Sequence, residues 1–418
     1  MICLFVLLIE LLLARMITLL TGSLDTTIAI GFIFLFTIAY FFVIFTKNKY
    51  RTVRKPLFCG YLLRQFFFTW DFLGRGILTL PGSGADTEHF WQSALYYAKG
   101  MIEKGTNGVT TFGTMVRLFG DSRVFIQFLL MLFSIATLHV IYRILIMAGL
   151  SKRNICFAMW FAALLPNYAI MSVIFLRESM ITFCVSLSLF CFVGWWVKKK
   201  DILFFMSFVT VFVGALYHSG IVAIAVGYII IRFLYDKKTE AFKLNFTSII
   251  VSILFLLAFV FLFNNYGSRF FSKMQRIEDI SDIASGSGRG NSSYAAIAGD
   301  SSTITSFIRY TPIRVFLFLF TPLFFQIRGY NDLIAMLFSA FFYLWVWIRS
   351  IKYLSHNTCK KTLMISLLII ALVVAFVFGW GSTNVGTNLR HRDKLIPLYI
   401  LMLGLSNHKE LKTKETYC

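Results

Sequence analysis

About a dozen stretches of this chain are continuously apolar and close in length to the thickness of a lipid bilayer. A spanning helix needs roughly 20 apolar residues, and backbone groups inside lipid must be satisfied within their own segment. Runs of this length are therefore helices, whereas a β-barrel would show short segments of alternating polarity. The predicted fold class is all-α, a polytopic transmembrane helical protein of about 12 spans. The spans are predicted at residues 2–20, 27–46, 57–74, 122–147, 155–174, 180–197, 202–217, 219–235, 244–263, 331–349, 362–380 and 393–407.

Composition and charge agree with a membrane protein. Hydrophobic residues make up 58% of the chain and charged residues only 14%, which leaves too little polar surface for a water-soluble particle. The net charge of +21 sits mainly in short loops between the apolar runs. That pattern is typical of membrane topology rather than of nucleic-acid binding, and it places the basic loops in the cytoplasm. One threading of the chain through the membrane places all of these basic loops, and both termini, in the cytoplasm.

One apolar stretch, residues 304–326, does not fit that threading as a span. If it crossed the bilayer, the basic loop at residues 352–361 would lie outside. We therefore predict a re-entrant or interfacial helix that is broken at Pro312 and Pro322. Such backbone is tolerated at membrane depth where protein or a cavity covers it.

The threading makes residues 1–418 a single integral membrane domain with two external segments and a cytoplasmic tail at 408–418. The first external segment, 75–121, contains an amphipathic surface helix that Asp86 or Thr87 is expected to cap. The second, 264–305, is rich in Gly and Ser and is predicted to be a mobile loop.

A second set of charged residues falls in the outer half of the bilayer or just outside it. A charge at membrane depth costs ~2.5–3.5 kcal/mol, and pairing, for example of Arg64 with Asp71, offsets part of this cost. Cations outnumber acids in the set, and the surplus is Arg, whose planar fork matches phosphate oxygens. An outward-facing cavity for a lipid-linked phosphate or pyrophosphate is therefore predicted. The set is Arg64, Asp71, Arg75, Asp86, Glu88, His89, Arg177, Glu178, His218, Arg309, Arg314, Arg328, Asp332, Arg390, His391 and Arg392.

Three residues of this set are candidates for proton transfer. Asp86 lies just before the amphipathic helix, where a carboxylate is either a general base on a sugar hydroxyl or a helix cap. His89 lies about one turn further on and is expected to share that work. His218 ends a span in Tyr217-His218-Ser219-Gly220, and it is equally well a base or an ordinary interfacial histidine.

The stretch GSTNVGTNLRHR at residues 381–392 is the most informative part of the chain. Glycines and small polar residues lead into Arg390, His391 and Arg392 at the start of the last span. A turn followed by clustered cations at a helix start is able to wrap a phosphate group, although an ordinary polar loop also fits. The cysteines and histidines show no metal-ligand spacing, so neither a metal nor another cofactor is expected.

These motifs together resemble Wzy-type polysaccharide polymerases, including the EpsG-like branch. The resemblance rests on an early Gly-Ala-Asp-x-Glu-x-Phe helix at 84–90, Arg177-Glu178, and His218-Ser219-Gly220. It continues with Arg314 before a Pro-x-x-x-Gln turn at 322–326 and with Asn-x-Gly-Thr-x-x-Arg-His-Arg at 384–392. The resemblance covers most of the chain through short, degenerate motifs.

The resemblance implies a GT-C-like glycosyltransferase of the bacterial inner membrane. Such enzymes join undecaprenyl-pyrophosphate-linked oligosaccharide repeat units at the outer face, for O-antigen, capsule or exopolysaccharide, without a metal. A chain-length regulator and a flippase of the same pathway are expected partners. Pyrophosphate would be held by Arg177, Arg314, Arg328, Arg390, His391 and Arg392. Proton transfer would fall to Asp86, His89 or His218. Further substrate contacts are expected from Glu88, Glu178, Arg309, Asn384 and Thr387.

Three other functions are alternatives for the same residues, and only analysis of the product separates the first of them from a polymerase. A GT-C enzyme that adds single sugars from a polyprenyl-phosphate donor usually has an acidic pair in its first external loop, which Asp86 and Glu88 resemble. An O-antigen ligase has similar chemistry with a different acceptor. A flippase or transporter is expected to show repeated halves and charges at the midplane, and neither feature is visible in the sequence.

Overall fold

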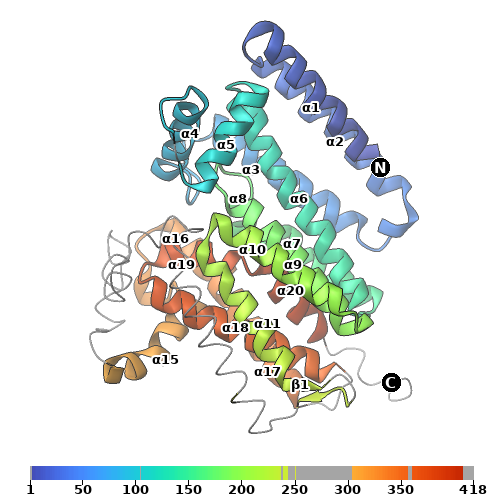
Figure 1. Cartoon of the computed structure of the whole chain (residues 1–418), viewed down its shortest axis with the longest axis vertical. Helices are drawn as coiled ribbons and strands as arrows, with labels where there is room; N and C mark the ends of the chain where they lie inside the picture. The colour runs from blue at the N-terminus through green and yellow to red at the C-terminus, as the bar shows by residue number, and fades with distance from the viewer. Residues whose placement is uncertain are drawn as a thin grey trace. The chain divides into compact units, whose positions relative to one another are not determined.

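The computed structural model is almost entirely helical where it describes the chain (Figure 1). It describes residues 2–103, 105–236, 239–242, 250, 304–355 and 360–407. In those residues the only strands are the two-residue β1 (Tyr235–Asp236) and β2 (Ala241–Phe242), which pair antiparallel. The all-α prediction is confirmed. The predicted span 244–263, the loop 264–305 and the tail 408–418 lie outside the described residues, apart from Ile250, Ile304 and Thr305.

The first of two compact units comprises residues 1–139 and 155–183. Its helices α4 and α5 pack against each other, as do α1 and α2 (Figure 1). Its elements are α1 (Ile2–Thr21), α2 (Thr26–Thr46), η1 (Asn48–Tyr50), α3 (Arg54–Leu73), α4 (Ala85–Ala98), α5 (Asn107–Phe119), most of α6 (Arg123–Met147), most of α7 (Lys152–Leu164), α8 (Pro166–Met171) and the start of α9 (Glu178–Lys198).

The second unit comprises residues 140–154 and 184–418. Helix α18 forms its centre, because it packs against both α11 and α15. Besides the ends of α6 and α9, its elements are α10 (Asp201–Tyr217), η2 (Ser219–Ile221), α11 (Val222–Leu234), α15 (Ile304–Phe320), η4 (Phe324–Gln326), α16 (Tyr330–Ala335), the π-turn η5 (Met336–Ala340), α17 (Phe341–Leu354), α18 (Lys361–Gly381), α19 (Val385–Asp393) and α20 (Ile396–Leu405).

Six helices of the described chain are long and apolar enough to cross a membrane. They are α1, α2, α6, α9, the continuous run from α16 to α17, and α18. This agrees with a membrane protein. Three shorter apolar helices, α10, η2 with α11, and α20, have 10–17 residues.

Proline positions explain where predicted and observed helices differ. The predicted helix 155–174 is two helices, because Pro166 begins α8 and Leu165 before it leaves the helical conformation. The predicted helix 393–407 is shorter in the structure, since α20 begins at Ile396, with Pro397 in its first turn, and ends at Leu405. Pro322 follows the end of α15 as predicted, whereas Pro312 does not break that helix. Transmembrane helices tolerate an internal proline where neighbouring groups satisfy the freed backbone.

The basic loops of the second unit lie at one end of its helices. Lys199 donates to the Tyr235 hydroxyl over 2.9 Å, which joins the start of α10 to the end of α11. Lys360, just before α18, donates to the Gly149 carbonyl over 2.6 Å. Helices α11 and α18 run antiparallel, because Gly220 lies against Phe378 and Gly227 lies against Ile370. We call loops 198–200 and 360–361 together the basic end.

We predict that the two ends of α18 face opposite sides of the membrane. Its 21 residues span about 31 Å at 1.5 Å per residue, which matches the hydrocarbon core. Lys361→Cys and Gly381→Cys should therefore be labelled by an impermeant maleimide from opposite sides in a cysteine-free background. A Cβ at Gly381 meets no atom within 4 Å, so the substitution fits. Labelling of both positions from one side would contradict a crossing.

Candidate functional site

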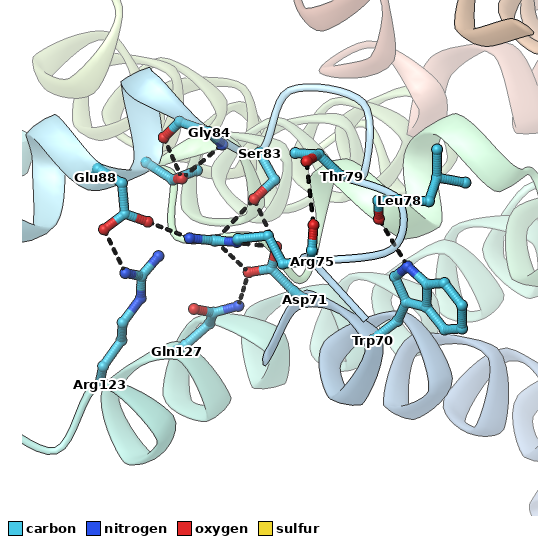
Figure 2. A network of polar contacts seen from close by, with 11 residues as sticks. Trp70, Asp71, Arg75, Leu78, Thr79, Ser83, Gly84, Glu88, Arg123 and Gln127 are labelled. Atoms are coloured by element: carbon cyan, nitrogen blue, oxygen red, sulfur yellow. Dashed lines mark hydrogen bonds and ion pairs between the residues drawn. The ribbon is translucent and has the colours of Figure 1, made fainter. Parts of the chain in front are cut away.

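In the first unit, a network of ion pairs joins α3, α4 and α6 (Figure 2). Glu88 bridges two guanidiniums, one of Arg75 and one of Arg123 at 2.8 Å. Arg75 also reaches Asp71, one helical turn before it, at 3.2 Å. Asp71 is buried and accepts from Ser83 Oγ at 2.6 Å and from Gln127 Nε2 at 2.9 Å. The network fixes the loop between α3 and α4.

This network changes the interpretation of two predictions. Glu88, predicted to contact substrate, makes ion pairs within the protein. Arg64 does not pair with Asp71, and that prediction is wrong. Arg64 is fully buried and donates to Ser134 Oγ at 2.6 Å and to the carbonyls of Gly60 and Ala163 at 3.0 Å. Carbonyl oxygens satisfy a guanidinium at membrane depth without an acid.

Asp86 and His89 both lie on the exposed side of α4. The N-cap position of this helix is Gly84, and Thr87 completes the turn by accepting from the Gly84 N–H over 3.0 Å. Of the two predicted capping residues, Thr87 is therefore the one that caps. Asp86 and His89 face outward, as residues that meet a substrate from solution would.

Arg177 and Glu178 lie where α9 begins. Arg177 is half-buried, and its guanidinium carbon is 5.6 Å from the centre of the Phe90 ring on α4. A side chain on Gly108 of α5 would touch Arg177, so both helices of the external segment approach this residue. Glu178 is buried in the first turn of α9, where a carboxylate interacts favourably with the helix dipole.

In the second unit, the structure brings together two predicted histidines from distant segments. His218 follows the last residue of α10, and His391 lies in α19. Their ring centres are 4.4 Å apart, and both rings pack on Phe378 of α18, at 5.5 and 4.6 Å. Gly220 allows this approach, because a Cβ there would collide with the Phe378 ring. We call His218 and His391 the histidine pair.

Arg314 lies on the same end of α18 as the histidine pair. It is buried in α15, and its guanidinium carbon is 4.1 Å from the Trp380 ring centre. Trp380 is held by donation to Thr311 Oγ1 over 3.0 Å. Gly379 allows α15 and α18 to touch, because a Cβ added at this position would lie only 2.9 Å from the Arg314 carbonyl oxygen.

Arg392 connects α19 to the elements around it. It is fully buried and donates to the Leu319 carbonyl and to Ser339 Oγ, both over 2.7 Å. Its guanidinium carbon is 4.5 Å from the Tyr343 ring centre, and the Tyr343 hydroxyl donates to Asp393 over 2.9 Å. These donors point at the protein's own oxygens, which favours a positioning role over the predicted contact with a diphosphate.

Lys394 is a candidate site residue that sequence reasoning missed. It is buried, and its Nζ is 3.0 Å from His391 Nδ1. A protonated amine has only donors, so a protonated Lys394 would donate to Nδ1 and leave the His391 proton on Nε2. Its signal in the sequence was the spacing of three residues from His391 at the start of the last apolar run.

The remaining predicted residues have local roles or lie on the surface. Asn384 caps α19 by accepting from the Thr387 N–H over 3.2 Å. Arg390 is half-buried in the last turn of α19. Arg309 and Arg328 are exposed, and the Arg328 N–H donates to Asp332 over 3.1 Å.

The histidine pair lies at the opposite end of the second unit from the basic end. Helix α10 begins beside 198–200 and ends at His218, while α18 begins at Lys361 and ends beside Trp380. Arg314, which packs on Trp380, therefore lies at the opposite end of α18 from Lys360. Among the described residues, no three Cys, His, Asp or Glu gather as metal ligands would.

Comparisons with known proteins add no assignment. No family model matches the chain, and neither a curated protein nor a solved structure is similar to it. Function must therefore be argued from the geometry of the site.

We predict that the Glu88 ion pairs stabilise the first unit in a pH-dependent way. The hydrogen bond from Arg123, and then that from Arg75, stabilise the ionised carboxylate and lower the pKa of Glu88 below its ordinary value. A lowered pKa gives stability above the ordinary pKa, about 4.3, that is lost as the pH falls through the folded-state value. Glu88→Gln should lower the melting temperature at pH 7, by a small amount for a partly exposed pair, and the difference should shrink as the pH falls below the ordinary pKa of a glutamate and through the lowered pKa of Glu88. The exposed Glu103→Gln is the control. An unchanged melting temperature at pH 7 would contradict the prediction.

Proposed function

We propose that this protein is a polysaccharide polymerase that joins undecaprenyl-pyrophosphate-linked repeat units at the outer face of the bacterial inner membrane. One observation carries the proposal. His218, Arg314 and His391 come from three distant segments, and all three lie around the last turn of α18. These are residues of three of the motifs that resemble Wzy-type polymerases. We also propose a GT-C-like architecture in which shorter helices raise the number of crossings to about a dozen.

The placement of charge supports a diphosphate at this end of the second unit. The basic end carries the loop lysines that mark the cytoplasmic side in membrane proteins. The histidine pair and Arg314 lie at the other end, which is then the outer face. Cations there have no topological purpose, and a lipid-linked diphosphate is an anion that reaches this depth while its tail stays in lipid.

The site suggests how the glycosidic bond would form. The hydroxyl of the acceptor repeat unit attacks the anomeric carbon of the growing chain, and a new C–O bond forms. The bond from that carbon to the diphosphate oxygen breaks, and undecaprenyl diphosphate leaves with the electron pair. His218 takes the hydroxyl proton. His391, with its proton on Nε2, and the cations Arg390 and Arg314 stabilise the charge that develops on the leaving group.

The external helices of the first unit are the proposed place for the sugar chain. Asp86 and His89 are exposed on α4, and Arg177 stacks near Phe90 of the same helix. Hydroxyl-rich sugars suit exposed polar and aromatic groups of this kind. In this proposal, Asp86 and His89 contact hydroxyls of the sugar chain.

The decisive test is the product made by variants in cells that form the polysaccharide but lack the native chain. His218→Ala and Arg390→Ala should reduce long polymer at least tenfold, because they remove the base and a charge on the leaving group. The lipid-linked single repeat should accumulate. Lys352→Ala, exposed near the basic end, is the matched control and should be silent. Normal chain length in both site variants, with membrane insertion verified, would refute the polymerase. Single repeats that lack one sugar would indicate a single-sugar transferase instead.

Lys394 offers a second test, because its donation to Nδ1 fixes the His391 tautomer. Lys394→Met keeps most of the side-chain volume but removes the donor, and it should slow polymerisation. Lys394→Arg keeps a cationic donor and should retain much more activity than Lys394→Met. Equal activity of the two variants, with equal amounts in the membrane, would show that the hydrogen bond is not used.

A further inference from the structure

A carboxyl group is buried in the middle of α1, the first apolar helix of the chain. Glu10 and Ala14 are the only two buried residues of α1, whose opposite face carries exposed apolar side chains. Glu10 has no exposed surface, and neither of its carboxyl oxygens has a hydrogen-bond partner among the residues that the structure describes. The carboxyl group therefore faces the protein interior rather than lipid or a partner helix.

The charged groups around α1 do not compensate a carboxylate at this position. Arg15 of α1 itself donates to the carbonyls of Arg117 and Leu118. In the first unit, the charged side chains within α2, α3, α5 and α6 bond elsewhere or are exposed. They are Arg54, Lys55, Arg64, Asp71, Arg117 and Arg123. An ionised Glu10 would therefore be a buried charge without a counter-ion in the described part of the first unit.

Hydroxyl and imidazole groups extend from Glu10 toward η1, which lies among the basic residues after α2. Tyr61 of α3 interacts electrostatically with Glu10, and its hydroxyl is 2.6 Å from Thr37 Oγ1. The Tyr61 ring stacks on Tyr40 of α2, with the ring centres 4.8 Å apart. The Tyr40 hydroxyl is 3.2 Å from His139 Nε2, and the His139 ring lies against the aromatic ring of η1. We call Tyr61, Tyr40 and His139 the polar row.

On its other side, Glu10 is closed off by apolar packing. Ala14, one turn after Glu10, packs with Leu24 before α2, with Ala29 of α2 and with Phe125 of α6. These side chains offer neither a donor nor an acceptor of hydrogen bonds. Of the two ends of α1, only the end beside η1 is therefore connected to Glu10 by groups that can pass a proton.

We propose that Glu10 is a proton-binding site inside the membrane, supplied along the polar row from the side of η1. A charge at membrane depth is costly, and a buried group without a partner avoids this cost by staying neutral. A proton also needs no cavity, which suits oxygens that have no exposed surface. A metal cation would need several oxygen ligands around it. The site is independent of the proposed polymerase chemistry, because all of its residues lie in the first unit.

Infrared spectroscopy of the full chain in nanodiscs at pH 7 reports the protonation state of Glu10 directly. The native protein should show the C=O stretch of a protonated carboxyl group, which shifts in D₂O. Glu10→Gln should lack this band, whereas Glu10→Asp keeps an acid and should move the band rather than remove it. Glu103→Gln, at an exposed acid, is the control and should keep the native band.

Two results would overturn the proton site. A native spectrum without a protonated-carboxyl band would mean that Glu10 is ionised and is held by a cation instead. A band that persists unchanged in both Glu10 variants would belong to another acid. Equal melting temperatures of native protein and Glu10→Gln at pH 7 are expected, because an amide then replaces a neutral group of the same shape.

The rate at which the Glu10 band shifts after transfer to D₂O tests the polar row. Tyr40→Phe keeps the stacked ring but removes the hydroxyl, so the shift should slow by about tenfold or more. Tyr228→Phe removes the hydroxyl of a buried tyrosine in the second unit and should exchange at the native rate. Native exchange rates in both Tyr40→Phe and His139→Phe would overturn the polar row as the route to Glu10.

Discussion

The buried guanidinium of Arg392 is the contact on which the candidate site depends. It ties the end of α15, through the Leu319 carbonyl, to Ser339 in the π-turn before α17. Because Arg392 belongs to α19, this fixes the helix that carries His391 and precedes Lys394. Arg314 lies on α15, so the same contact sets its distance from α19. Replacing Arg392 would destabilise the fold by more than the net contribution of its hydrogen bonds, because the buried oxygens that accept from it would remain without a donor.

The second unit separates two uses of positive charge. At the basic end, Lys199 donates to the Tyr235 hydroxyl just after α11, and Lys360 donates to the Gly149 carbonyl just after α6. At the other end, Arg314 packs on Trp380 and Lys394 reaches His391. A lysine would be a poor substitute for Arg314, because only the planar guanidinium stacks on the Trp380 indole.

The sequence predicted membership of the membrane class and the positions of the long helices, because apolar length is a strong signal. It also singled out His218, Arg314 and His391 individually, since charge in an apolar context is costly. It could not predict partners across space. Arg64 and Asp71 lie seven residues apart on α3, and the sequence predicted an ion pair between them. In the structure, the Arg64 guanidinium donates to a carbonyl of α7, and the Asp71 carboxylate pairs with Arg75. Lys394 was missed because it resembled an ordinary basic flank of a span. The helix break at Pro166 was missed because the span was predicted from its hydropathy, which does not show where a proline ends a helix.

Under the proposed function, a sugar chain would need water, and an isoprenoid diphosphate would need the edge of the hydrocarbon. Asp86 and His89 of the first unit are exposed on α4, as contacts to a sugar chain would have to be. Lys394 and the histidine pair lie together in the second unit. Ion pairs hold α4 onto α3 and α6, so acids there are neutralised by neighbouring arginines. In the second unit, Arg314 packs on the Trp380 ring and Lys394 reaches the His391 imidazole. Cations that lie against rings in this way are the groups that the proposed diphosphate site would use.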